Sequence, residues 1–143
     1  MNKYKELKNR HQEELNEIPL IVAFDAQDLE QEMKSLGLQP NETDAVYKLH
    51  NCAYILKSDR DRYNGMLQRF KDEEKQAINA DKTGDGFIYD MFFYQFEIHQ
   101  LFESEFVYHA LKALELTKKD ILKSPNLLNG YKKAFKVFEN YYY

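Results

Sequence analysis

The chain has 143 residues, of which 43% are hydrophobic, and these values fit a single domain, residues 1–143, whose core needs no disulfide or metal. A net charge of −4 argues against a basic surface, so nucleic acid is not an expected partner. The single cysteine, Cys52, excludes an internal disulfide and indicates a reducing compartment.

The first apolar run, Ile18 to Phe24, is too short for a signal peptide or a membrane span, and it follows a charged segment. We therefore expect a cytoplasmic protein without a membrane association.

The first elements are expected to be a helix and a strand. Residues 2–16 place apolar or aromatic side chains at helical spacing, which predicts an amphipathic surface helix with a half-buried His11. Residues 18–24 are rich in β-branched and aromatic residues, which predicts a short strand with Pro19 near its start.

A small helix and a hairpin should follow. Asp25 is an expected N-cap and Gly37 an expected C-terminal glycine for the helix between them. Residues 45–50 and 53–57 alternate around a turn, which predicts a β-hairpin that pairs with the Ile18 strand. His50 and Cys52 beside this turn are read either as a nucleophilic dyad or as ordinary turn residues, and no third orienting group is visible nearby.

The second half of the chain is expected to be helical. Ser58 has capping spacing for a helix that runs to Asp81, and an aromatic helix follows from Phe92 to Leu114. Thr117 predicts another cap, and the pair Ser124-Pro125 predicts the start of the last helix. The expected fold is α+β and mostly helical, with a small antiparallel sheet of about three strands packed by a central aromatic helix and a helical C-terminus.

The loop before the aromatic helix resembles the calcium loop of EF-hands. Residues of matching type stand at loop positions 1, 3, 5, 6 and 8, namely Asp81, Thr83, Asp85, Gly86 and Ile88. Position 12 holds Phe92 where a bidentate Glu belongs, so the loop supplies too few oxygens for calcium. The other interpretation is a structural turn in which Asp81 or Asp85 caps the next helix and Gly84 and Gly86 take positive φ.

A second candidate site lies on the aromatic helix. At about 100° per residue, His99 and Glu103 fall on its apolar stripe, whereas Glu97, Glu105 and His109 point elsewhere. The pair is read as a satisfied core pair, as a polar spot for a ligand or partner, or as part of a catalytic or metal site. A di-iron site would need a second Glu-x-x-His, which the sequence lacks.

The C-terminal pair of helices superficially suits a helix-turn-helix. Its second helix offers only Asn126, Asn129, Lys132 and Lys133 for a duplex, so core packing is the expected role.

Three motifs point to a family: residues 83–92 (TGDGFIYDMF), 113–117 (ALELT) and 125–131 (PNLLNGY). With them, most of the chain resembles a family of small uncharacterised proteins found in low-GC bacteria and their phages. The resemblance implies no catalytic or binding residue. A phage association would favour a small accessory protein, including an inhibitor of a host defence enzyme.

Two function hypotheses follow. The first is a non-catalytic interaction or regulatory protein that binds another protein through a tyrosine-rich, acidic surface, because tyrosine gives a large contact area at low entropic cost. The second is a small metal-binding protein that uses Asp81, Thr83 and Asp85, with His99 and Glu103 as further candidates. No enzyme activity and no cofactor are expected, and a homo-oligomer remains open.

Overall fold

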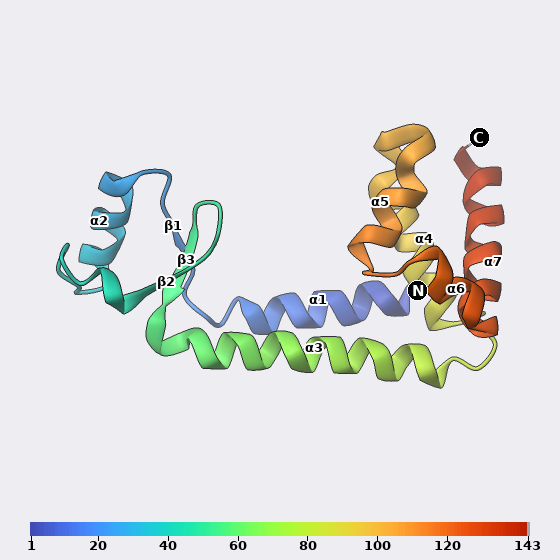
Figure 1. Ribbon diagram of the computed structural model, residues 1–143, viewed down its shortest axis with the longest axis horizontal. Coiled ribbons are helices and arrows are strands. Elements are labelled where there is room, and N and C mark those ends of the chain that lie inside the picture. The colour runs from blue at the N-terminus through green and yellow to red at the C-terminus, as the bar shows by residue number, and fades with distance from the viewer. Residues whose placement is uncertain (143) are drawn as a thin grey trace. The chain divides into compact units, whose positions relative to one another are not determined.

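The computed structural model describes the backbone of residues 1–142, and the side chains of these residues except 101–103 (Figure 1). Within this part of the chain, no helix combines the length and the apolar character needed to cross a membrane.

Helices dominate the structure. The α-helices among the described residues are α1 (Lys3–Leu15), α2 (Ala26–Ser35), α3 (Arg60–Ala80), α4 (Phe87–His99), α5 (Phe106–Ala113), α6 (Lys118–Lys123) and α7 (Pro125–Tyr142). The strands are β1 (Ile21–Val22), β2 (Val46–His50) and β3 (Ala53–Leu56). Short 3-10 helices cover Thr43–Ala45, Lys57–Asp59 and Gln100–Glu105. The predicted α+β, mostly helical fold class is confirmed.

The chain divides into two compact units. The helical unit contains Met1–Arg10 and the chain from Asp72 onward, and the sheet unit contains His11–Lys71. The expectation of one domain stays a prediction.

In the sheet unit, the three strands are antiparallel in the order β1-β3-β2, as the hairpin pattern predicts. Ile21 pairs with Tyr54 across β1 and β3, and Asn51 takes a φ of 49° in the turn between β2 and β3. A left-handed conformation is tolerated by Asn more readily than by most residues, which suits this turn.

The sheet is packed by other elements than the expected ones. Ile55 of β3 is buried in a cluster with Ile18, Met66 and Phe70, and the last two belong to α3. His11 of α1 is only 4% exposed, more buried than the sequence predicts, because its ring stacks on Phe70 with 3.9 Å between ring centroids. The aromatic helix α4 has its own core in the helical unit.

The caps of the sheet unit are mostly as predicted. The side chain of Asp25 accepts a hydrogen bond from the backbone N–H of Asp28 at 2.8 Å, and Gly37 follows α2 with a φ of 79°. The prediction of a Ser58 cap is wrong, because Ser58 lies in a 3-10 turn and α3 begins only at Arg60.

The helical unit is built around α4. Phe92 and Phe96 of α4 are fully buried, and the Phe96 ring contacts rings of α5 and α7, including Phe106 at 5.5 Å and Phe138 at 5.8 Å between centroids. Aromatic pairs in this geometry add to the free energy gained by burial. The predicted role of this segment as a core helix is confirmed.

Where the sequence predicts one aromatic helix, the structure has two. The first, α4, ends at His99, and after the 3-10 segment Gln100–Glu105 the chain returns as α5 beside α4 (Figure 1). The apolar periodicity continues through this reversal, so periodicity alone does not reveal it. Phe96 and Phe106 therefore face each other from neighbouring helices.

The predicted caps of the last two helices are confirmed. Thr117 and Asp120 form a reciprocal capping box at the start of α6. Ser124 precedes Pro125, the first residue of α7, and its Oγ accepts a hydrogen bond from the backbone N–H of Leu127 at 3.4 Å.

Candidate functional site

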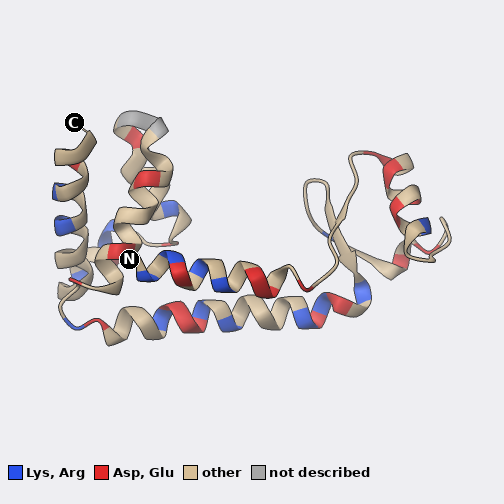
Figure 2. Ribbon diagram, turned by 180° about the vertical axis from the view of Figure 1, so that it is seen from behind, with Lys and Arg blue, Asp and Glu red and all other residues tan. Residues whose placement is uncertain are grey.

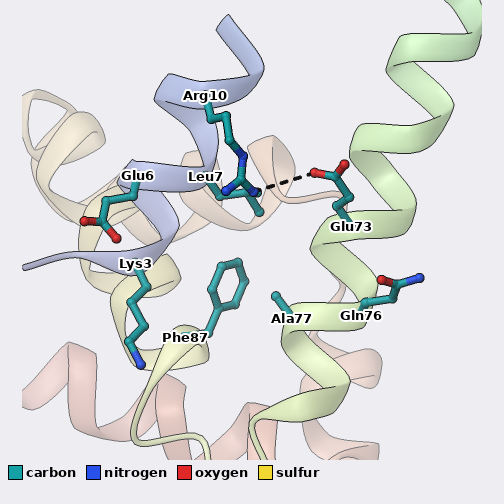
Figure 3. Close-up of a pocket in the computed structure, with 8 residues that line it drawn as sticks. All are labelled: Lys3, Glu6, Leu7, Arg10, Glu73, Gln76, Ala77 and Phe87. Atoms are coloured by element: carbon teal, nitrogen blue, oxygen red, sulfur yellow. Dashed lines mark ion pairs between the residues drawn. The ribbon is translucent and has the colours of Figure 1, made fainter. Parts of the chain in front are cut away.

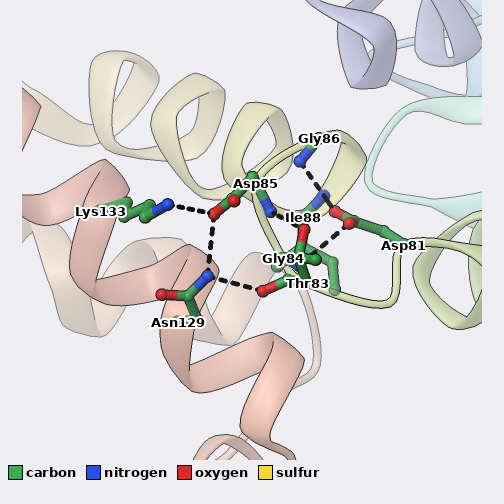
Figure 4. A network of polar contacts seen from close by, with 8 residues as sticks. All are labelled: Asp81, Thr83, Gly84, Asp85, Gly86, Ile88, Asn129 and Lys133. Carbon is green, nitrogen blue, oxygen red and sulfur yellow. Dashed lines mark hydrogen bonds and ion pairs between the residues drawn. The ribbon is translucent and has the colours of Figure 1, made fainter.

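The loop between α3 and α4 is organised by the carboxylate of Asp81 (Figure 4). Its oxygens accept hydrogen bonds from the backbone N–H groups of Gly84, Gly86 and Ile88 at 2.9, 3.1 and 3.0 Å. Ile88 lies in the first turn of α4, so the prediction that Asp81 caps this helix is confirmed. Partial burial alone would raise the pKa of Asp81, but the backbone donors outweigh it and lower that pKa below its ordinary value.

The second loop carboxylate, Asp85, is bound by α7. It accepts hydrogen bonds from Asn129 Nδ2 at 2.8 Å and from Lys133 Nζ (Figure 4). Asn129 Nδ2 also donates to the backbone carbonyl of Thr83 at 2.6 Å. The Lys133 ammonium, together with Asn129, holds the pKa of Asp85 below its usual range. Two residues considered for DNA recognition thus tie α7 to the loop.

This geometry bears on the EF-hand resemblance. In a calcium loop, the carboxylates at positions 1 and 5 point to the ion. Here Asp81 points to backbone donors and Asp85 to Asn129 and Lys133, so a cation would have to displace several hydrogen bonds. Of the two glycines expected at positive φ, Gly84 has a φ of 90°, whereas Gly86 has a φ of −106°, so the prediction for Gly86 is wrong.

The structure places His99 at the end of α4, against His109 of α5. Their rings stack with 6.1 Å between centroids, and Glu105 Oε2 lies 3.8 Å from Nε2 of His109. Burial lowers the pKa of His99, and the His109 imidazole lowers it further. The side chain of Glu103 lies outside the described residues. Because residues 100–105 are a 3-10 helix, the helical projection that paired His99 with Glu103 does not apply across this segment.

Among the described residues, no three His, Cys, Asp or Glu side chains gather in a way that could hold a metal ion. His50 and Cys52 line different depressions in the sheet unit.

A surface cavity of about 450 Å³ lies in the helical unit between the start of α1 and the end of α3 (Figure 3). Its floor is apolar, with Leu7, Ala77 and Phe87, and its rim is charged. Lys3 and Glu6 lie on one side, and Arg10 approaches Glu73 to 3.9 Å on the other. The cations and carboxylates of the rim are of equal number, so no class of charged ligand is favoured.

In the sheet unit, exposed apolar side chains lie on β1 and directly before and after it. Leu20, Val22 and Phe24 are 59%, 44% and 81% exposed, and we call them the apolar edge. Ile21 and Ala23, which alternate with them, are buried. Among the residues that the structure describes, β1 is at the edge of the sheet and pairs only with β3. Exposed neighbouring apolar side chains of this kind are typical of surfaces that bind another macromolecule.

The apolar edge adjoins a groove of about 470 Å³. Leu20 and Pro19 line it next to Ala53 and Ile55 of β3, and Tyr63 of α3 contributes a ring. The groove is therefore mostly apolar and opens on the same side of the sheet as Leu20.

The sequence alone does not single out the apolar edge as a binding surface. The alternation of residues 18–24 is visible in the sequence, but it predicts a strand with one buried face and not which face lies in water. Knowing that Leu20, Val22 and Phe24 are the outward set requires the packing of Ile18, Ile21 and Ala23, which are all buried.

The chain belongs to the family of unknown function DUF7659, which it matches over residues 3–137. The resemblance to an uncharacterised family is thus confirmed at that level. No curated protein and no solved structure matches the chain.

Proposed function

We propose that this protein is a non-catalytic interaction protein that binds another protein through its apolar edge. The observation that carries this proposal is the exposure of Leu20, Val22 and Phe24, at 59%, 44% and 81%, side by side on one short segment. Burying such side chains yields roughly 1.5–3 kcal/mol each, which is enough to anchor an interface.

The polar groups that suggested chemistry have structural contacts in the helical unit. Asp81 caps α4, Asp85 binds Asn129 and Lys133, and His99 stacks on His109. These contacts favour a binding protein over an enzyme. They also favour it over the metal-binding alternative, because the loop carboxylates already have donors.

The tyrosine-rich surface remains part of the proposal. Tyr108, Tyr141 and Tyr142 are exposed in the helical unit, and Tyr142 donates a hydrogen bond to Glu97 at 2.9 Å. These tyrosines give the helical unit exposed contact area of its own at low entropic cost.

We extend the proposal to a regulatory role in a cytoplasmic setting, as a phage-type accessory protein or an inhibitor of a host defence enzyme. The support is the resemblance to small proteins of low-GC bacteria and their phages. An inhibitor needs an interface and no active site of its own, which agrees with a surface made of apolar side chains.

The test is affinity capture with the tagged full-length chain from the cells that make it, followed by mass spectrometry. The variant L20S/F24S removes two anchors, and L122S is the matched control, because Leu122 of the helical unit is also 59% exposed. We expect a partner protein that is retained by the wild type and by L122S and lost by L20S/F24S.

Capture of the same proteins in equal amounts by all three chains would contradict the proposal. Thermal melting of each variant shows that the loss does not come from unfolding, since exposed apolar-to-serine changes should alter the free energy of unfolding by less than about 0.5 kcal/mol.

A further inference from the structure

The backbone of β1 has an open side. The N–H of Ala23 donates to the carbonyl of Cys52 at 2.9 Å, and Ile21 pairs with Tyr54. In an antiparallel pair, alternate residues direct their backbone groups to the neighbouring strand. The N–H and C=O of Val22 therefore point away from β3, toward the free edge of the sheet.

This open side is short and bounded at both ends. Before it, the N–H of Ile18 donates to the carbonyl of Leu15 at 3.0 Å, and after it the N–H of Phe24 donates to the carboxylate of Asp28 at 3.1 Å. Between these ends, the outward backbone groups of Leu20 and Val22 are available to a strand from outside. An edge that is closed at its ends and open in its middle suits the docking of a short segment rather than unlimited sheet growth.

The sheet unit that carries the edge is acidic, although Lys48 lines the depression beside Phe24 together with Asp25. Residues 11–71 hold 11 acidic and 7 basic side chains, so the whole net charge of −4 falls in the sheet unit, and the 13 side chains of each sign elsewhere cancel. Residues 25–44, which begin directly after Phe24 and include α2, hold six acidic side chains and only one basic one, Lys34 (Figure 2). A segment that docks on β1 therefore approaches a unit with a net charge of −4.

We propose that the partner supplies an extended segment in which apolar and basic residues alternate, and that this segment pairs with β1 as a fourth strand. The outward N–H and C=O of Val22 would provide the backbone pairing. One face of the added strand would place apolar side chains against Leu20 and Val22, and its basic side chains would interact with the acidic surroundings. This inference rests on the proposed function, because it names the kind of partner that the apolar edge receives.

The negative charge of the sheet unit argues against two other occupants of the apolar edge. A second copy of this chain would bring its own acidic residues 25–44 toward the same surface, and like charges would repel. An anionic membrane would be repelled in the same way, although the apolar side chains alone would suit it. A basic extended segment satisfies the backbone, the apolar side chains and the charge together.

The probe is a fluorescent ten-residue peptide of alternating Val and Lys, and its matched control alternates Val and Glu. Binding to the full-length chain is measured by fluorescence anisotropy at low and at high salt. We expect the Lys peptide to bind at least about tenfold more tightly than the Glu peptide, because opposite charges attract. The affinity for the Lys peptide should fall at high salt, which screens this attraction. Equal binding of both peptides, or binding of neither, overturns the proposal.

Backbone pairing is tested by V22P against V22A. Proline removes the outward N–H without touching the pairing of Ile21 or Ala23 with β3, whereas alanine keeps the N–H and removes only side-chain contact. We expect the affinity for the Lys peptide to be about tenfold lower in V22P than in V22A. Equal affinities of V22P and V22A overturn strand addition.

Hydrogen exchange of the wild type gives a second reading that does not depend on how V22P folds. The amide of Val22 should gain protection when the Lys peptide is bound, and an unchanged exchange rate in the bound state overturns the proposal. Anionic vesicles and sedimentation of the free chain complete the test. Vesicle binding or a dimer that F24S abolishes, without peptide binding, assigns the edge to a membrane or to a second copy.

The two proposals fail in different ways. If L20S/F24S loses a native partner while V22P retains it as V22A does, the apolar edge binds a protein but not as an added strand. If the partner binds L20S/F24S as well as it binds the wild type, the proposed function itself fails.

Discussion

Gly84 and Gly130 approach each other so closely that neither position has room for a side chain. A Cβ built on Gly130 would lie 2.7 Å from the carbonyl oxygen of Gly84 and 2.5 Å from Cγ2 of Ile88. A Cβ built on Gly84 would lie 2.8 Å from the N of Gly130 and would also clash with the carbonyl oxygen of Asn126. This contact fixes α7 against the loop that precedes α4.

We predict that Gly130→Ala destabilises the protein by about 1–3 kcal/mol, because the methyl group forces α7 away from the loop. Gly84→Ala should cost more, since Gly84 also holds a φ of 90° that alanine adopts with strain. Urea unfolding of each variant measures the change.

Gly65→Ala is the control for these glycines. Gly65 lies inside α3 with open space around the Cβ position, so alanine there should stabilise the helix by about 0.5–1 kcal/mol. If Gly130→Ala melts like the wild type, the approach of α7 to the loop is not as tight as described.

Which features the sequence predicts depends on how far apart the interacting residues are. The caps at Asp25 and Thr117 join residues three positions apart, so a short motif contains both partners. The contact of Asp85 with Asn129 spans 44 positions, and nothing in one sequence pairs these residues. The loop could therefore be read as a turn, while its attachment to α7 could not.

At the reversal between α4 and α5, the local sequence signals predict the wrong structure. Residues 100–105 contain no Gly or Pro, and apolar residues continue at helical spacing on both sides. Local signals thus favour one long helix. The structure reverses there and brings the rings of Phe96 and Phe106 to 5.5 Å between centroids, a contact that a continuous helix would not allow.

The Asp81 carboxylate gives a prediction about pH. Replacing Asp81 with Asn should destabilise the protein by about 1–3 kcal/mol at neutral pH, because the charged acceptor of three backbone N–H groups is lost. The pKa of Asp81 lies below 3.8 in the folded protein, so its contribution is complete above about pH 4 and disappears as the pH falls through the folded value.

The difference in unfolding free energy between the wild type and Asp81→Asn should therefore be constant at higher pH and shrink in acid. Urea unfolding from pH 7 down to pH 3 measures it. A difference that stays the same across this range would show that the charge of Asp81 is not what the loop requires.

Calcium is predicted not to bind tightly to the loop. Phe92 occupies the position of the closing carboxylate, and Asp85 is engaged by Asn129 and Lys133. Millimolar calcium should leave the melting temperature unchanged, because only a bound ligand shifts it. Calorimetry that gives a dissociation constant below about 10⁻⁵ M would contradict this prediction.

His99 is predicted to make stability depend on pH near neutrality. Its pKa is lowered from 6.5 by burial and by His109, so the unfolded chain takes up the proton first. Stability should then fall as the pH drops below about 6.5 and level off below the folded pKa. His99→Gln should flatten this part of the curve in thermal melts, whereas His50→Gln, at an exposed position, should leave it intact.

The last prediction concerns Tyr4 and Gln95, which form a buried hydrogen bond in the core of the helical unit. Nε2 of Gln95 donates to the hydroxyl of Tyr4 at 3.0 Å, and the two residues are 7% and 1% exposed. Burial raises the pKa of Tyr4, so the hydroxyl stays neutral and its oxygen stays an acceptor at neutral pH.

Tyr4→Phe should destabilise the protein by about 1–3 kcal/mol, because the Gln95 amide loses its acceptor without access to water. Adding Gln95→Leu should recover part of this loss, since it removes the stranded donor. A double-mutant cycle measures the coupling, which should exceed about 0.5 kcal/mol, and Tyr108→Phe at a 63% exposed site provides the control. Strictly additive effects of the two core changes would mean that the hydrogen bond does not stabilise the folded state, and the attachment of α1 to α4 would then rest on ring contacts such as Tyr4 with Phe87.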